Sequence, residues 1–489
     1  MLRSKGPSSP RTALAEMLLL RGIFAVVSLG SLVVFGRLLD AKQFGLMAMA
    51  TTVLSVVGIF RDFGLAAACI QREHLSQDDR DELFFLSIIV AGLSFAFVVV
   101  AAPLFARLYG ETDLVPILIA SSVSYLAWGL QAQHAANLRR QMHFRPILVA
   151  EGCGVVMGLV VGAWVAFVRQ DVWALVATNL TQAVVTAILM FAAHPWLPGA
   201  WRRPSHLREY LLFGRDYMSH GLLNYLSGNW GQIVLGIRMG AVDLGYFNRA
   251  QQISAFPQTL LLNPLQEVST PMLSRQQEDK DRYHATYIEL LRRATLVMFP
   301  IAILLPILAV DVVQFLLGGG WEEAGRVLGW LAPTLAAQGV VMAAQVGLLS
   351  MGRVAEMRNF GLLDSALKLM ASLAGLHFGT VGVAAGMSIA SLLVAAPVGL
   401  WIVSRRGPSF GTQAAVVRDS ALAAMAAGLA ALAVSSSVHA MIPSAFLRLV
   451  AITGCAMIPA AAVALVLPGS RATILAVLKI VARRRSAVA

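Results

Sequence analysis

Ionisable side chains inside long apolar runs are the residues of this sequence most able to do chemistry. Lys368 lies about ten residues into the apolar run 358–378, and Asp364 precedes it by four positions. Four positions bring two side chains onto one face of a helix, where an acid and a base can pair. A charge at the bilayer centre costs about 2.5–3.5 kcal/mol on insertion scales, so such groups face a protein or aqueous interior. Lys368 either lines a substrate cavity or belongs to a neutralised structural pair.

Two arginines raise the same question. Arg21 lies about eight residues into the run 13–38, and Arg249 lies close to one end of the run 245–270. A long basic side chain can extend to the membrane surface or face a central cavity. We expect Arg21 to face the cavity, whereas for Arg249 anchoring at the interface and ligand binding remain open.

The run 214–238 is unusually polar. A helix facing lipid could not leave such groups unsatisfied, so they line an aqueous path or bond to neighbouring helices. Asp216 and His220, together with Asp364, are the candidates for ion coupling, and Asn224 and Asn229 are candidates for the lining of a substrate path. The four-residue spacing of Asp216, His220 and Asn224 predicts a polar stripe along one face of a helix. Tyr225, Asn229 and Gln232 form a second polar stripe beside it.

Sequence signatures of enzymes are missing. The chain has no G-x-x-x-x-G-K-[ST] loop, no H-E-x-x-H and no paired C-x-x-C. Its three cysteines, Cys69, Cys153 and Cys455, show no metal-ligand spacing. We therefore predict a protein that is not an enzyme, with no catalytic residue, no metal site and no cofactor other than H⁺ or Na⁺ used for coupling.

Composition places these residues in a membrane protein. Of 489 residues, 58% are apolar and 13% are charged, whereas soluble domains carry about 25% charged residues. A span needs about 20 apolar residues. We predict an all-α integral membrane fold with about fourteen transmembrane helices, at 13–38, 44–66, 83–106, 114–138, 146–168, 171–193, 214–238, 245–270, 290–316, 326–350, 358–378, 380–403, 418–438 and 444–467.

Basic residues fix the expected orientation. The N-terminal tail and every second connection carry 28 Lys and Arg, and the other connections carry 5. Because cytoplasmic loops are rich in Lys and Arg, both termini are expected in the cytoplasm. The net charge of +12 then comes from Lys and Arg residues that determine the orientation in the membrane, and it does not indicate nucleic-acid binding. A basic amphipathic tail, 470–485, is expected to bind anionic membrane lipids.

An internal repeat suggests the domain organisation. With a shift of 200 positions, Gly45 and Ala50 coincide with Gly245 and Ala250. The match relates six spans to six spans in a parallel repeat, an arrangement that usually serves alternating access. We predict an N-terminal lobe (1–194), a cytoplasmic linker (195–213), a C-terminal lobe (214–404) and two further spans with the tail (405–489). Spans 13 and 14 fall outside the repeat and are expected to be least involved in transport.

Several segments then resemble the polysaccharide repeat-unit exporters of the Wzx type, within the multidrug/oligosaccharidyl-lipid/polysaccharide exporter superfamily. They are Arg37–Ala50, Asp62–Leu65, Cys69–Arg72, Leu138–Arg145, Val172–Val176 and Leu244–Ala250. The resemblance implies two six-helix lobes around a cationic cavity in the bacterial inner membrane. It also implies translocation of undecaprenyl-diphosphate-linked oligosaccharides for exopolysaccharide or lipopolysaccharide synthesis, with a polysaccharide polymerase and co-polymerase as partners. Arginine and lysine suit a diphosphate.

The sequence departs from this family at one informative place. Members often carry an Asp in the middle of the seventh span, where this chain has Asn229, Trp230, Gly231 and Gln232. Ion coupling must then use another group or none, and Asp216 and His220 are the nearest substitutes. The alternative function is an ion-coupled multidrug or cation exporter on the same fold. Such an exporter favours an acidic cavity, whereas cations outnumber acids within these spans.

Overall fold

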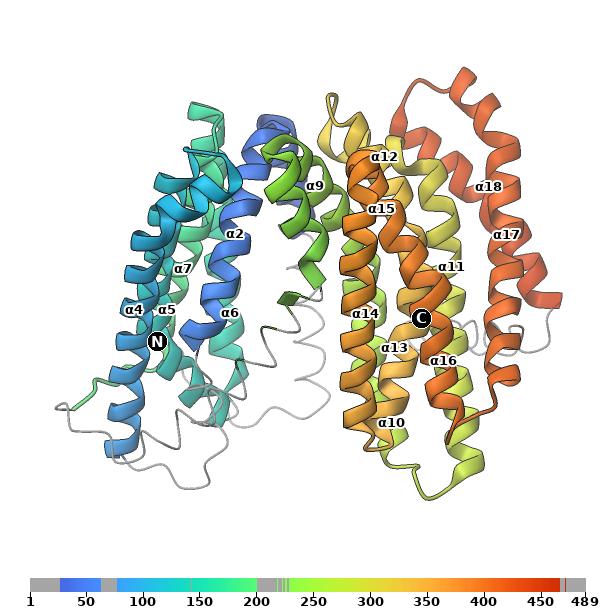
Figure 1. Cartoon of the computed structure of the whole chain (residues 1–489), viewed down its shortest axis with the longest axis horizontal. Helices are drawn as coiled ribbons and strands as arrows, with labels where there is room; N and C mark the ends of the chain where they lie inside the picture. Colours follow the sequence, from blue (N-terminus) through green and yellow to red (C-terminus); the bar gives the residue numbers. More distant parts are fainter. Residues whose placement is uncertain are drawn as a thin grey trace, which may run out of the picture. The chain divides into compact units, whose positions relative to one another are not determined.

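The computed structural model describes residues 27–62, 77–141, 143–199, 218, 222, 225–226, 228–466 and 471. Most of these residues are helical, and no β-strand occurs among them (Figure 1). Ten helical stretches in this part of the chain are long and apolar enough to cross a membrane, and a shorter apolar helix spans Val27–Leu38. The predicted all-α membrane fold is confirmed. The number fourteen stays a prediction, because the runs 13–38 and 214–238 are described only in part.

The helices follow the apolar runs closely. In chain order they are α2 (Ala41–Asp62), α4 (Gln77–Tyr109), α5 (Leu114–Arg140), α6 (Phe144–Arg169), α7 (Trp173–Ala193), a helix over 228–239, α9 (Ala241–Pro257), η1 (Gln258–Leu262), α10 (Asn263–Ser274), α11 (Lys280–Leu317), α12 (Glu322–Leu331), α13 (Pro333–Ser350), α14 (Val354–Gly375), η2 (Leu376–Phe378), α15 (Gly379–Ala390), η3 (Ser391–Ala395), α16 (Ala396–Ser404), α17 (Phe410–Met441) and α18 (Ala445–Val466).

Proline and glycine set the interruptions within the longest of these stretches. The π-helical turn η1 lies between Pro257 and Pro264, and η3 comes just before Pro397. Proline removes a backbone donor, and a π turn is one way in which a helix absorbs that loss. Gly379 has a φ of +72°, which favours glycine, and it separates α14 from α15 at the boundary predicted between two spans.

The chain divides into two compact units. The first comprises 1–225 and 236–245, and the second comprises 226–235 and 246–489. Close helix contacts through small residues hold α6 and α7 together in the first unit. A Cβ added to Gly158 would lie 2.7 Å from the carbonyl oxygen of Thr178. Small residues let helix backbones approach in this way in membranes, where apolar burial gives helices little reason to associate.

The start of the predicted linker packs against α4 and α5 within the first unit. The Trp196 ring stands edge-on to Phe84 and His134, with 5.8 Å between ring centroids in both pairs. The backbone N–H of Gly199 donates to the Asp81 carboxylate at 2.9 Å, and the His134 imidazole bonds to the carbonyl oxygen of His194 at 3.0 Å. Burial lowers the pKa of the His194 imidazole. Residues 194–199 are therefore part of this unit's packing.

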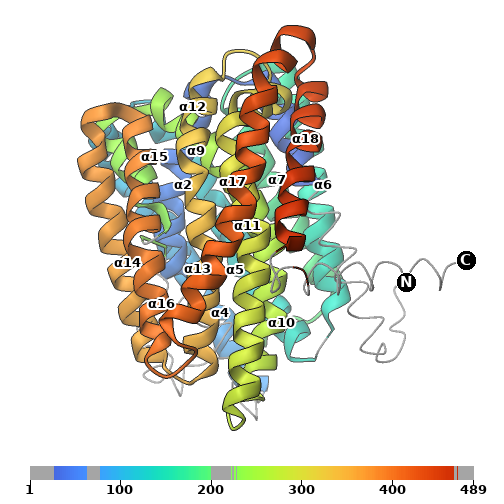
Figure 2. The same cartoon turned by 90° about the vertical axis from the view of Figure 1, so that its right-hand side faces the viewer.

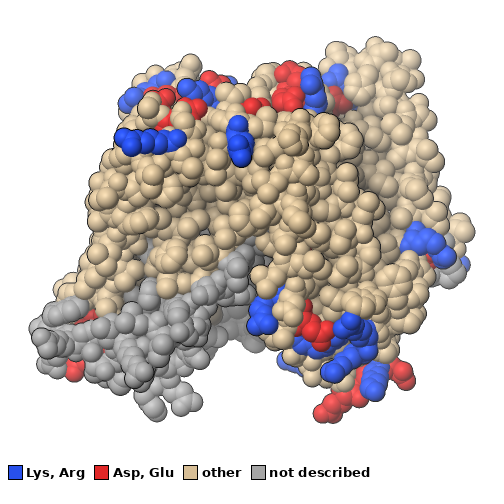
Figure 3. All heavy atoms as spheres, viewed as in Figure 1, with Lys and Arg blue, Asp and Glu red and all other residues tan. Residues whose placement is uncertain are grey.

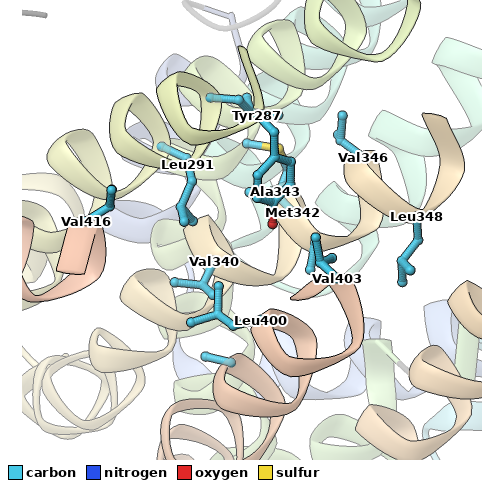
Figure 4. Packing of buried hydrophobic residues seen from close by; sticks show 14 of the residues in the cluster. Tyr287, Leu291, Val340, Met342, Ala343, Val346, Leu348, Leu400, Val403 and Val416 are labelled. Atoms are coloured by element: carbon cyan, nitrogen blue, oxygen red, sulfur yellow. The ribbon is translucent and has the colours of Figure 1, made fainter. Parts of the chain in front are cut away.

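Tyr287 belongs to an apolar core of the second unit (Figure 4). Its ring packs beside α13 and α16 residues such as Ala343 and Val403, and its hydroxyl donates to Gln413 Oε1 at 3.2 Å. The Gln413 amide in turn donates to the carbonyl oxygens of Leu400 and Pro408. One buried amide therefore joins α11, α16 and α17.

We expect Tyr287→Phe to destabilise the protein while leaving the apolar packing intact. The change removes the hydroxyl donor and leaves Gln413 Oε1 buried without this partner, a loss of about 1 kcal/mol. Thermal unfolding in detergent measures it. Gln413→Leu should cost more, because Gln413 also serves two carbonyl oxygens. An unchanged melting temperature in both variants would contradict the assigned role.

Helix α11 is longer than a membrane crossing requires. α11 has 38 residues, or about 57 Å, against a hydrocarbon core of about 30 Å. Its N-terminus is capped by Asp279, whose carboxylate accepts from the Arg282 backbone N–H at 3.0 Å. α17 and α18 pack along α11 (Figure 2). On the face shown in Figure 3, most charged side chains lie toward the top or the bottom of the view, and other residues fill the stretch between them.

Candidate functional site

Lys368 and Asp364 form an ion pair on α14. Lys368 Nζ donates to Asp364 Oδ2 at 2.6 Å, and the side chains are 21% and 13% exposed. The sequence places both in an apolar helix with the i, i+4 spacing that favours pairing. The predicted pairing is confirmed, and the ammonium is partly accessible although it lies within a span.

A tryptophan fixes a second helix beside this pair. Trp230 Nε1 donates to Ser365 Oγ at 3.0 Å, so the helix over 228–239 lies against the stretch of α14 that carries Asp364. Asn229 precedes Trp230 and is half-buried. The structure thus brings the Asn229 segment and the Lys368–Asp364 pair onto neighbouring helices of the second unit.

The same short helix is joined to α9 by an amide pair. Gln232 Nε2 donates to Gln251 Oε1 at 2.7 Å. Two positions before Gln251, Arg249 is half-buried and donates through Nη2 to the Asn248 side chain at 2.8 Å. Arg249 is therefore held on the helix that follows the Asn229 segment.

The chemistry of this region is that of a cation held by one carboxylate. A lysine ammonium has three N–H donors, and among the described residues Asp364 is the side chain that takes one of them. The remaining donors can serve an anionic ligand. The Asp364 carboxylate holds the ammonium through Oδ2, so an anion bound at Lys368 would share that cation with Asp364.

Four other predicted site residues are not placed. Arg21, Asp216, His220 and Asn224 lie outside the described residues, and their assignments stay predictions. The same holds for the tail 470–485 except Arg471.

Sequence reasoning missed a buried cluster that joins three helices. Asp311 of α11 accepts from Arg448 of α18 through Nε at 2.9 Å and Nη2 at 2.6 Å. His439 of α17 places Nε2 3.0 Å from the other carboxylate oxygen. The position of Asp311 near the end of an apolar run was the only signal in the sequence that it needs a partner. Its partners lie more than a hundred residues away in the chain, so the sequence could not identify them. The cluster links α11, α17 and α18 within the second unit.

Comparison with known proteins identifies the family. A family model described as "Polysaccharide biosynthesis protein" matches residues 34–326, more than half of the chain. Lipopolysaccharide biosynthesis protein WzxC of Escherichia coli (strain K12) is 24% identical over 378 residues, which cover 76% of this chain and 75% of that protein.

Two further relatives match over shorter stretches. Teichuronic acid biosynthesis protein TuaB of Bacillus subtilis (strain 168) is 26% identical, over 56% of this chain and 57% of its own length. Succinoglycan biosynthesis transport protein ExoT of Rhizobium meliloti (strain 1021) is 23% identical, over 61% of this chain and 60% of its own length. The chain therefore spans about three fifths of these two proteins.

Solved structures share the fold. The lipid II flippase MurJ in an inward closed conformation superposes with a TM-score of 0.75 at 12% identity, covering 92% of this chain and 98% of MurJ. An inward-facing multidrug resistance MATE family transporter gives 0.63 at 13% identity, covering 80% and 95%. With the matched family model, these likenesses lead to one conclusion: the chain belongs to the polysaccharide biosynthesis protein family, and the predicted membership among polysaccharide exporters of the Wzx type is confirmed.

Proposed function

We propose that this protein moves undecaprenyl-diphosphate-linked oligosaccharide repeat units from the inner to the outer leaflet of the bacterial inner membrane, by alternating access. The product serves exopolysaccharide or lipopolysaccharide synthesis. The observation that carries the proposal is the partly accessible Lys368–Asp364 pair within an apolar helix of a protein of this family.

The pair suits a diphosphate head group. Phosphate oxygens accept strong charge-assisted hydrogen bonds from ammonium groups, and Lys368 retains donors that Asp364 does not take. Arg21 and Arg249 are further candidate cations for the same anion, and Asn224 and Asn229 are candidates for hydrogen bonds to sugar hydroxyls. Substrate binding thus competes with Asp364 for the ammonium.

We also propose Asp364 as one candidate for the group that couples transport to H⁺ or Na⁺. Asp216 and His220 are the other candidates for the coupling group.

Transport by purified protein tests the function. The protein is reconstituted in liposomes with a short-chain polyprenyl-diphosphate sugar, and leaflet exchange is followed with and without an H⁺ or Na⁺ gradient. Exchange that depends on the protein is expected. No exchange under any gradient or potential would reject the proposal.

Orientation and partners extend the proposal. The charge asymmetry of the connections supports cytoplasmic positions for both termini, and fusions of reporters to each end test this placement. A polysaccharide polymerase and co-polymerase are the expected protein partners, and anionic lipids are expected at the basic tail. A deletion strain with drug hypersensitivity and normal polysaccharide would instead favour the multidrug exporter.

A further inference from the structure

Three arginines gather around one acid at the end of the second unit where α16 ends and α14 begins. Arg353, which directly precedes α14, is buried and donates through Nη1 to the carbonyl oxygen of Ile402 on α16 at 3.1 Å. Its Nε donates to Glu356 Oε1 at 2.6 Å. Arg405 and Arg406 follow α16, and both act electrostatically on the same Glu356 carboxylate. This arginine cluster therefore has an excess of positive charge.

The arginine cluster continues an apolar face of α16. The Arg405 guanidinium carbon lies 4.0 Å from the centroid of the Trp401 ring, which is a cation–π contact. Trp401 is 50% exposed, and Pro397, four positions earlier, is also exposed. Side chains four positions apart share a helix face, so an exposed apolar stripe leads along α16 to Arg405. Tryptophan is enriched at the level where lipid tails meet lipid head groups.

The connection that carries the two outer arginines is held in place. The Gly407 backbone N–H donates to the carbonyl oxygen of Val403 at 2.8 Å, and the Gln413 amide donates to that of Pro408 at 2.8 Å. The arginines at the start of this connection are nevertheless exposed, and neither forms an ion pair within the part of the chain that the structure describes. Their N–H donors are therefore available to an outside ligand.

We propose that the arginine cluster and the apolar stripe bind an anionic phospholipid of the cytoplasmic leaflet. The stripe offers contact to acyl chains, and a guanidinium can bind a phosphate through two hydrogen bonds. A free phosphate would leave the stripe unused, and a zwitterionic lipid would bring another cation to a cluster that already has an excess. The basic-residue count assigns this end to the cytoplasm, where anionic lipids attract arginines. Such a site does not require that the protein move lipid-linked sugars.

Quenching of Trp401 fluorescence by brominated lipids measures the preference. The full chain is reconstituted in phosphatidylcholine vesicles that contain a small fraction of brominated phosphatidylglycerol or brominated phosphatidylcholine. Trp401 is one of nine tryptophans, so each variant is paired with the same variant carrying Trp401→Phe, and the quenching that disappears belongs to Trp401. The ratio of this quenching between the two brominated lipids gives the preference for the anionic head group within each variant.

The parent should prefer brominated phosphatidylglycerol by at least about tenfold. Arg405→Gln and Arg406→Gln should each lower the preference by about fivefold, and the double variant should show almost none. Lysine at both positions keeps the charge and should retain most of the preference. Arg326 of α12 is separated from this end by the length of α13 and is 68% exposed, so Arg326→Gln is the matched control and should leave the preference unchanged.

Three results would overturn the lipid site. They are equal quenching by both brominated lipids in the parent, a preference that survives the double glutamine variant, and an equal loss in Arg326→Gln. A short-chain polyprenyl diphosphate is the rival occupant, and its displacement of brominated phosphatidylglycerol at a lower concentration than unlabelled phosphatidylglycerol would assign the cluster to the transported lipid instead. Absence of leaflet exchange in the same vesicles would reject the proposed function and leave the lipid site standing.

Discussion

Lys368→Gln should lower the initial rate of lipid-linked oligosaccharide exchange by at least about tenfold without lowering the amount of folded protein. A charge-assisted hydrogen bond contributes about 1.5–3 kcal/mol, and the change also leaves the Asp364 carboxylate uncompensated beside the path of an anionic substrate. Leaflet exchange in liposomes measures the rate, and the protein level in membranes controls for folding. Lys368→Arg keeps the charge with a different donor geometry and should retain part of the activity.

The double variant Lys368→Gln/Asp364→Asn separates a binding role from a structural one. It removes both charges and keeps two groups that can hydrogen-bond at i, i+4. If the pair served only to neutralise itself, the double variant would regain exchange close to that of the wild type. If Lys368 binds the diphosphate, the double variant stays inactive although it is stable. Asp364→Asn alone should keep exchange and lose its dependence on an ion gradient.

A second pair with the same spacing provides the control. Arg293 donates to Glu289 at 2.8 Å, also at i, i+4, and its side chain is 49% exposed. An exposed pair of this kind contributes little to stability, so Arg293→Gln should leave exchange unchanged. An equal loss of exchange in the Arg293 and Lys368 variants would show that the assay reports general damage. Full activity of Lys368→Gln would refute its assignment to the substrate path.

The sequence predicted the contacts that are local in the chain. The Lys368–Asp364 pair needs only one helix and a four-residue spacing, and both follow from an apolar run that contains two charges. The bond from Trp230 to Ser365 joins residues 135 positions apart, and no periodicity carries that information. The close approach of Gly45 to Ala241 and of Gly245 to Ala41 lies between these cases, since the repeat aligned the two glycines but could not indicate which residues they meet.

Helix ends were predicted less well than helix positions. The ninth span was predicted at 290–316, whereas α11 begins at Lys280. Hydropathy detects only the part of a helix that lies in lipid, and charged residues such as Lys280, Asp281 and Arg282 continue the same helix into water. For α2, the reciprocal cap of Asp40 and Gln43 marks the true start at Ala41, a signal that sequence inspection could have used.

Arg448→Met should destabilise the protein strongly and leave transport by the folded fraction unchanged. Arg448 and Asp311 are 13% and 5% exposed, and removing one member of a buried ion pair costs about 3–5 kcal/mol, because the remaining charge is left without its partner. His439 remains beside Asp311 but is 44% exposed. Thermal unfolding in detergent measures the loss, and the rate per folded molecule tests the prediction that spans 13 and 14 are least involved in transport.

Further variants test whether the loss of stability in Arg448→Met comes from the unpaired buried charge. Asp311→Asn should cost less than Arg448→Met, since Arg448 also donates to the carbonyl oxygens of Ile442 and Pro443 and keeps those partners. The double variant should recover part of the stability, because no unpaired carboxylate remains. Arg418→Met breaks a pair with Asp419 whose arginine is 70% exposed and should cost less than about 1 kcal/mol. Slower transport per folded Arg448→Met molecule would instead show that the Asp311 cluster, which links α11, α17 and α18, takes part in the transport cycle.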